Sequence, residues 1–237
     1  MSSPLLKENQ NITGSGRNHG IDLLRLVLMF MVCMLHTLGQ GGILNASAEG
    51  TNAYRAYWFL EILSYCAVDG FAVISGYAAS NRPRKYDKIV NMWFQAFFYS
   101  FILTGVLTVI GISDSWATDD MIKCVFPITF NKFWYFTDFF ALFFAIPVLN
   151  KFLFSISEEV AKKALIIIFV LFSVLGIFND SFRTAGGYSA IWLIVLYCIG
   201  VLAKRVKLFE KYADITVCED NQKLEDTIES VLDALGE

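Results

Sequence analysis

Six apolar segments long enough, or nearly long enough, to cross a lipid bilayer follow one another along this chain of 237 residues. A membrane-spanning α-helix needs about 20 predominantly apolar residues. The composition agrees, because hydrophobic residues make up 56% of the chain and charged residues 17%, against about 45–50% and 25% in soluble domains. The sequence therefore predicts an all-α, polytopic transmembrane helical bundle of about six membrane helices, at residues 21–39, 57–79, 89–110, 133–154, 160–178 and 188–203.

The charges between these segments predict the orientation of the bundle. Lys and Arg are retained on the cytoplasmic side of a membrane. The stretches after the second, fourth and sixth segments carry four, three and four of these residues, whereas those after the first, third and fifth carry one, two and one. This pattern predicts a multi-pass protein with a cytoplasmic N terminus. Because the basic residues are confined to short loops, nothing indicates nucleic-acid binding.

The two ends of the chain differ from its apolar body. Residues 1–209 hold 17 Lys and Arg against 13 Asp and Glu, whereas residues 210–237 hold 2 against 9. Within this acidic end, the apolar residues between 221 and 235 recur on one helical face, which predicts a short amphipathic helix. We therefore expect a polar cytoplasmic leader (1–20), a transmembrane domain (21–207) and an acidic cytoplasmic tail (208–237).

Ionisable side chains inside apolar segments are costly in a bilayer, so they usually face a protein interior or a wet cavity. Asp22 and Arg25 are three residues apart in the first segment, so they share a helical face and are placed to pair. Arg25 and His36 are eleven residues apart and also share a face, separated by about 16 Å at a rise of ~1.5 Å per residue. The further ionisable groups inside apolar segments are Glu61, Asp69 and Asp138.

His36 is the only histidine in an apolar segment, and an imidazole is the usual general base near neutral pH. The alternative is a histidine that hydrogen-bonds across helices as part of the packing. The stretch 68–77 adds a carboxylate at Asp69 and a hydroxyl at Ser75, and its alternative interpretation is a packing motif. Ser75 does not complete a nucleophile elbow, because Val73 stands where the GxSxG pattern needs a glycine.

Two further groups of residues have a possible chemical role. The basic loop with Arg82, Arg84 and Lys88 either anchors the phosphates of a cytoplasmic ligand or only sets the topology. The five cysteines include no CxxC pair and no zinc-ligand spacing, and most lie in or beside apolar segments, where a free thiol behaves as a small hydrophobe. With no second histidine in a membrane segment, the sequence predicts no metal site.

The motifs, in this order, resemble the integral-membrane acyltransferase family 3, whose multi-spanning members are O-acyltransferases that modify cell-envelope glycans. The first segment opens with Gly20-Ile-Asp-Leu-Leu-Arg25 and has the family's basic residue and histidine separated by ten residues, as Arg25 and His36. The stretch 68–77 resembles the family's next block, as does Phe-Trp-Tyr-Phe at 133–136 leading to Pro-Val-Leu-Asn at 147–150. The resemblance runs from about residue 17 to residue 207.

Two departures from the family pattern stand out. The family commonly has an Arg-x-x-Arg pair at the start of its third helix, where this chain reads Lys-Ile-Val-Asn at 88–91 and has no arginine. A lysine lacks the bidentate fork of an arginine. Members also typically have about ten membrane helices, against six predicted here, so the resemblance implies a C-terminally truncated chain.

The resemblance implies that an acyl group, most often acetyl from acetyl-CoA in the cytoplasm, is transferred to a hydroxyl of a polysaccharide or glycolipid of the bacterial cell envelope. In this scheme His36 deprotonates the acceptor hydroxyl, Asp22 orients Arg25, and Asp69 and Ser75 line the cavity as further members of the catalytic site. The basic residues that would hold the CoA phosphates are Arg25, Arg82, Arg84 and Lys88.

The expected location is the plasma membrane, with the bilayer, acyl-CoA and the glycan acceptor as partners. Two other functions remain open from the sequence. One is an inactive membrane fragment that serves as an interaction partner. The other is a small-molecule transporter with the acidic residues as a polar path, although a transporter would more often show an internal repeat with broken helices in matching positions.

Overall fold

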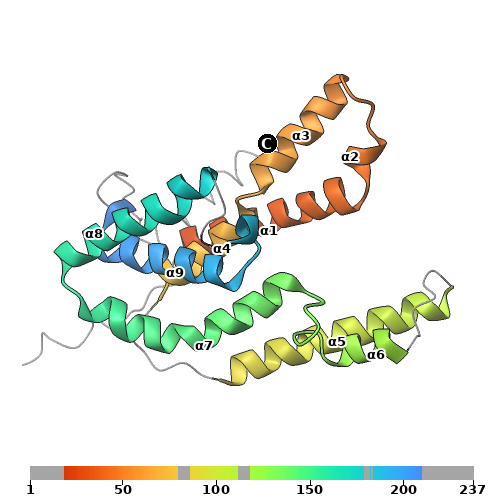
Figure 1. The fold of residues 1–237 in the computed structure, drawn as a ribbon. Helices are drawn as coiled ribbons and strands as arrows, with labels where there is room; N and C mark the ends of the chain where they lie inside the picture. The colour runs from red at the N-terminus through yellow and green to blue at the C-terminus, as the bar shows by residue number, and fades with distance from the viewer. Residues whose placement is uncertain (1–18, 80–85, 112–117, 179–181, 183, 210–237) are drawn as a thin grey trace, which may run out of the picture.

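The computed structural model describes residues 19–79, 86–111, 118–178, 182 and 184–209. Within these ranges all regular structure is helical, which confirms the predicted all-α membrane bundle. The predicted tail helix at 221–235 lies outside the described residues, as do Arg82 and Arg84. Figure 1 shows the arrangement, whose α-helices are α1 (His19–Leu35), α2 (Ile43–Ala46), α3 (Asn52–Ser64), α4 (Ala67–Tyr77), α5 (Asp87–Val109), α6 (Thr118–Val125), α7 (Trp134–Ser155), α8 (Glu158–Phe169) and α9 (Ala190–Arg205).

Shorter helical turns extend or connect these helices. Helix α1 continues into the π-helix η1 (His36–Gln40), and α8 continues through the π-helix η2 (Val170–Val174) into the 3₁₀ turn η3 (Leu175–Ile177). A further 3₁₀ turn, η4 (Ala185–Gly187), precedes α9.

In the described part of the chain, five helical stretches are long and apolar enough to span a membrane: His19–Gln40, Asn52–Tyr77, Asp87–Val109, Trp134–Ser155 and Glu158–Ile177. They confirm the first five predicted spans to within a few residues. The second span begins at Asn52 rather than 57, because the Thr51 hydroxyl caps α3 by accepting the Tyr54 N–H at 3.1 Å. That span is also broken into α3 and α4 at Tyr65 and Cys66.

The sixth predicted span is a helix, but it is shorter than the other five. Helix α9 has 16 residues, which is too short for a span at the usual rise of ~1.5 Å per residue. It is instead the most buried helix in the described part of the chain, since nine of its residues are buried. It packs against α4, α7 and α8. The apolar side chains of α9 therefore lie mainly in the protein core rather than against lipid.

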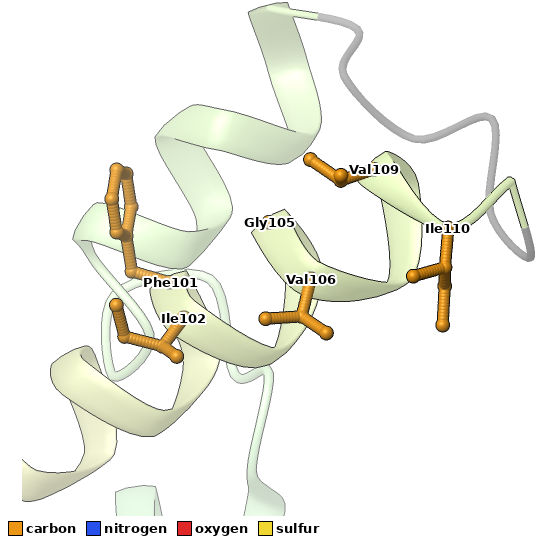
Figure 2. Close-up of a pocket in the computed structure, with 6 residues that line it drawn as sticks. All are labelled: Phe101, Ile102, Gly105, Val106, Val109 and Ile110. Atoms are coloured by element: carbon orange, nitrogen blue, oxygen red, sulfur yellow. The ribbon is translucent and has the colours of Figure 1, made fainter.

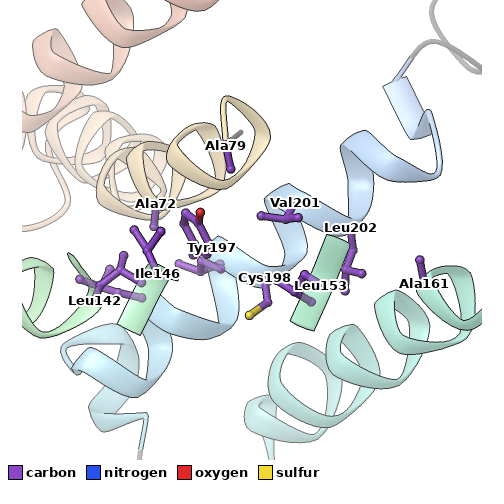
Figure 3. Close-up of a cluster of buried hydrophobic side chains, with 12 residues drawn as sticks. Ala72, Ala79, Leu142, Ile146, Leu153, Ala161, Tyr197, Cys198, Val201 and Leu202 are labelled. Atoms are coloured by element: carbon purple, nitrogen blue, oxygen red, sulfur yellow. The ribbon is translucent and has the colours of Figure 1, made fainter. Parts of the chain in front are cut away.

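Helices α4 and α9 approach each other closely through two glycines. A Cβ placed on Gly76 would lie 2.0 Å from the backbone oxygen of Tyr197, and one on Gly200 would lie 2.1 Å from the backbone oxygen of Val73. Only glycine allows backbones to come this near, as small residues do at helix interfaces in membranes. Figure 3 shows the buried cluster around this crossing, to which α7 and α8 contribute Leu142, Ile146, Leu153 and Ala161.

Polar contacts tie the inner helices together. The Tyr197 hydroxyl on α9 donates to Asn150 Oδ1 on α7 at 2.7 Å, and both side chains are buried. The Arg205 guanidinium at the end of α9 donates to the backbone oxygens of Leu153 and Ile156 at the end of α7. Carbonyls in the last turn of a helix have no partner within the helix, so this arginine satisfies two groups that would otherwise need water.

Two helical hairpins lie at the periphery of the bundle. Helices α1 and α3 contact each other on one side, and α5 contacts α6 on the other (Figure 1). Most of the large apolar side chains of α5 are exposed, including Phe94, Leu103 and Val109. In a multi-pass membrane protein such faces contact lipid, where an exposed apolar side chain carries no free-energy penalty.

Candidate functional site

The predicted ion pair on α1 is present. Arg25 Nη1 donates to Asp22 Oδ1 at 3.3 Å, one turn away on the same helix. Both side chains are partly exposed, so the pair sits on the surface of α1 rather than in the core. Because a guanidinium has five N–H donors, one bond to Asp22 leaves others for a ligand.

His36 lies where α1 changes from an α-helix to a π-helix. Its backbone oxygen accepts the N–H of Gly41 at 2.8 Å, the wide hydrogen bond that defines this turn. A Cβ on Gly41 would lie 2.2 Å from the backbone oxygen of Thr37, so the turn closes only with glycine there. π-turns inserted into α-helices occur frequently at functional sites. Here the turn presents the imidazole at the exposed end of the span.

The imidazole of His36 has a defined partner. Its Nδ1 lies 2.9 Å from Oε1 of Gln40, four residues further along the same turn. An amide oxygen only accepts hydrogen bonds, so this contact requires the tautomer that carries the proton on Nδ1. In that tautomer the lone pair of Nε2 is free, and a neutral histidine in this form can act as a base.

A buried carboxylate lies beside this turn. Glu61, on α3, is 6% exposed, and its Oε2 atom has no hydrogen-bond partner among the described residues. The carboxylate is near enough to His36 for a direct electrostatic interaction. Gly39 makes room for it, because a Cβ at that position would lie 3.2 Å from Glu61 Oε1. The sequence marks Glu61 as an ionisable residue in an apolar segment, but its proximity to His36 comes only from the packing of α3 on α1.

Asp69 is engaged in a contact that the sequence does not reveal. The indole Nε1 of Trp192, on α9, donates to Asp69 Oδ1 on α4 at 2.8 Å. The two residues are 123 positions apart, and both are half-buried. The bond satisfies one carboxylate oxygen and ties α4 to α9 about two helical turns before their close approach at Gly76.

Ser75 and the basic residues complete the predicted set. The Ser75 hydroxyl donates to the backbone oxygen of Phe71 at 2.8 Å, one turn earlier in α4, so it is not poised as a nucleophile. Lys88 lies exposed in the first turn of α5. The remaining basic candidates, Arg82 and Arg84, lie outside the described residues.

The site residues are therefore brought together in three places rather than in one cavity. Asp22 and Arg25 form one group near the start of α1, and His36 and Glu61 form a second near its end. Asp69 joins α4 to α9 in the third place. Within the described ranges, no group of three or more His, Cys, Asp and Glu side chains could hold a metal ion.

One pocket lies away from all three places. It is a cavity of about 310 Å³ along α5, and Figure 2 shows the apolar residues that line it, Phe101, Ile102, Gly105, Val106, Val109 and Ile110. No polar side chain lines it, so it offers no group for chemistry.

The fold and these polar groups define a multi-pass membrane protein with a histidine base candidate and a buried carboxylate at one end of its first span. A family model for an acyltransferase domain, that of acyltransferase family 3, matches residues 18–212. The chain therefore belongs to this family of membrane acyltransferases, as its motifs predict. No curated protein and no solved structure shows significant similarity to it.

Proposed function

We propose that this protein transfers an acyl group, in the first instance acetyl, from cytoplasmic acyl-CoA to a hydroxyl of a cell-envelope polysaccharide or glycolipid. The observation that carries the proposal is the position of the buried Glu61 carboxylate of α3 against the turn that holds His36, on the helix that also bears Arg25. Membership of the acyltransferase family supports the reaction type. The identity of the donor, acetyl-CoA, and of the acceptor, an envelope glycan, belongs to this proposal.

His36 acts as the general base in this proposal. With Nδ1 bonded to Gln40, the free Nε2 takes the proton of the acceptor hydroxyl. The hydroxyl oxygen then attacks the thioester carbonyl of the donor. The C–S bond breaks, and the CoA thiolate leaves and takes up the proton that His36 received. An ester forms, and the histidine returns to its neutral state.

Glu61 stabilises the charge that His36 acquires during this step. The imidazolium is a cation, and a carboxylate at close range in a medium of low dielectric constant favours it. Because Glu61 Oε2 has no hydrogen-bond partner among the described residues, the carboxylate has an acceptor atom available to the reacting groups. Glu61 is thus a positioning and electrostatic residue in this scheme.

Arg25 binds the donor at the other end of α1. The Asp22 carboxylate holds its guanidinium in place, and the remaining N–H groups suit the phosphates of CoA. About 16 Å along the helix axis separates Arg25 from His36 at ~1.5 Å per residue, and the extended pantetheine arm of CoA covers a distance of this order. Lys88, Arg82 and Arg84 add positive charge on the same predicted side.

The proposed location is the plasma membrane, with the N terminus in the cytoplasm. The loops rich in Lys and Arg, including 80–88, then face the cytoplasm, where acyl-CoA is made. His36 lies at the far end of the first span, toward the acceptor. Asp69 and Ser75, on α4, complete the set of residues in the proposed site.

The experiment is acetyl transfer from labelled acetyl-CoA to envelope glycan in membranes that contain the full chain. Removal of a general base typically lowers the rate by ~10²–10⁴, so His36→Ala should lose transfer by this factor at normal protein levels. The matched control is His19→Ala, since His19 is the other histidine and lies exposed at the first residue of α1. Full transfer by His36→Ala would refute the base assignment.

Glu61→Gln provides the second arm of the same assay. It keeps the size of the side chain and removes the charge, so it should lower the transfer rate with little change in protein level. Glu49→Gln is the matched control, because Glu49 is exposed in the loop between α2 and α3. An equal effect of the two variants would contradict the role of Glu61.

A further inference from the structure

A second group of reactive side chains lies outside the proposed acyltransfer site. Cys124, in the last turn of α6, is 2% exposed. The Lys132 Nζ atom donates to its Sγ atom at 2.9 Å and to Thr104 Oγ1, on α5, at 3.3 Å. Cys124 Sγ and Thr104 Oγ1 are themselves 3.3 Å apart. The three atoms form a closed triangle of a thiol, an ammonium and a hydroxyl.

A tight turn between α6 and α7 aims Lys132 at this thiol. Asn131 adopts a left-handed conformation with φ 49°, which asparagine tolerates better than most residues. The backbone N–H groups of Asn131 and Lys132 donate to the backbone oxygens of Ile128 and Pro127 at 3.0 and 2.9 Å. The chain therefore doubles back, and the lysine points across the end of α6.

The surroundings favour the ionised form of the thiol. Burial raises the pKa of Cys124, but the hydrogen bonds with Lys132 and Thr104, the nearby Ser100 hydroxyl and the charge of Lys132 outweigh this effect and hold the pKa below its usual value. Lys132 is the charged group that acts on Cys124 among the described residues. A thiolate beside a cation is the nucleophilic form of cysteine.

The Ser100 hydroxyl supplies a second observation. Its side chain is on α5 and is 3% exposed, and its Oγ atom has no hydrogen-bond partner within normal distance among the described residues. It is nevertheless close enough to Cys124 to lower the pKa of the thiol. Buried hydroxyls are seldom left without a partner. The Ser100 hydroxyl is thus a buried group near the sulfur that is available to bond to an added atom.

We propose that Cys124 is a site of oxidation by hydrogen peroxide or another small peroxide. The thiolate attacks one peroxide oxygen, so an S–O bond forms and the O–O bond breaks. Sulfur is oxidised by two electrons to a sulfenic acid, and the departing hydroxide takes a proton and leaves as water. Lys132 and Ser100 hydrogen-bond to the added oxygen. Only a small oxidant reaches a thiol that is 2% exposed.

The predicted topology places this site on the non-cytoplasmic side of the membrane. The segment 111–132 follows the third span and precedes the fourth, and it belongs to the loops poor in Lys and Arg. Thiols on that side are exposed to oxidising conditions. The oxidation itself does not depend on acyl transfer and is measured without it.

The test exposes the purified full chain in detergent to hydrogen peroxide and follows each cysteine separately. After the protein is unfolded in SDS, dimedone traps any sulfenic acid, and peptide mass spectrometry locates it. Cys124 should be labelled much faster than Cys198, which is also buried but on which no lysine of the described residues acts. Labelling of Cys124 no faster than of Cys198 would overturn the proposal.

Lys132 variants separate a reactive site from a merely structural contact. Lys132→Met raises the thiol pKa and so lowers the thiolate fraction at neutral pH. The thiolate that remains is more nucleophilic, so the oxidation rate should fall by about threefold for each unit of pKa. The rate should also rise at a higher pH than in the parent protein. Lys132→Arg keeps the positive charge and should retain most of the rate. Equal rates and pH profiles in Lys132→Met and the parent, at equal helix content, would refute the role of Lys132.

Discussion

The close approach of α4 and α9 allows a strong prediction about stability. In Gly200→Ala the new Cβ would lie 2.1 Å from the backbone oxygen of Val73 and 2.8 Å from the backbone nitrogen of Tyr77, whereas ordinary contacts begin near 3.4 Å. The atoms in the way belong to the backbone of α4 and cannot rotate aside. The two helices must therefore move apart by about 1 Å at the centre of the buried cluster.

The expected cost follows from two opposing effects. Overpacking of a core typically costs about 1–3 kcal/mol, and a backbone clash belongs at the upper end of this range. Replacing glycine by alanine in a helix recovers up to about 1 kcal/mol. We expect a net loss of about 2 kcal/mol in the free energy of unfolding, which is about thirtyfold in the ratio of folded to unfolded protein.

The assay is unfolding in detergent micelles by titration with SDS, followed by far-UV circular dichroism. Gly176→Ala is the matched control, because Gly176 lies in the helical turn η3 and a Cβ there meets no atom within 4 Å. It should be as stable as the parent protein or slightly more so. Equal stability of the Gly200→Ala and Gly176→Ala variants would refute the described crossing.

A double variant tests whether the two glycines act at one contact. Gly76→Ala places its Cβ 2.0 Å from the backbone oxygen of Tyr197, on the opposite side of the same crossing. Once one alanine has separated the helices, the second meets less resistance. The combined loss of stability should therefore be clearly smaller than the sum of the single losses, whereas additive losses would indicate two independent contacts.

Three further predictions concern the polar groups and the topology. Trp192→Phe removes the indole donor to the carboxylate on α4, so the free energy of unfolding should fall by about 1–3 kcal/mol in the SDS titration. Asp22→Asn combined with Arg25→Gln should preserve membrane-integrated protein better than either single change, because neither charge then loses its ion-pair partner in the first span. A cysteine placed at Thr118 should react with an impermeant maleimide from outside the cell, and one at Arg84 only after the membrane is opened.

Each of these predictions has a clear contrary outcome. Unchanged stability in Trp192→Phe would show that the contact between α4 and α9 does not need its hydrogen bond. A double variant at Asp22 and Arg25 that accumulates worse than both single variants would show that the charges act separately. Reversed labelling at Thr118 and Arg84 would invert the topology and with it the proposed donor side.

Much of the architecture follows from the amino-acid sequence alone, for a physical reason. In lipid, a chain segment must satisfy its own backbone hydrogen bonds, so an apolar stretch of sufficient length becomes a helix. This is why five predicted spans agree with the structure to within a few residues. Because the segment is helical, Asp22 and Arg25, three residues apart, lie on one face of α1, where their ion pair forms. The order of motifs also sufficed to indicate the family.

Only the tertiary structure decided which of these helices touch and what their polar groups meet. Local periodicity carries no information about partners far away in the chain, because those contacts depend on how the helices pack. The packing brings Glu61 to His36, bonds Asp69 to Trp192 across 123 residues, and aims Lys132 at Cys124. It also turned the apolar α9 into a buried core helix, because two glycines allow its backbone to meet that of α4.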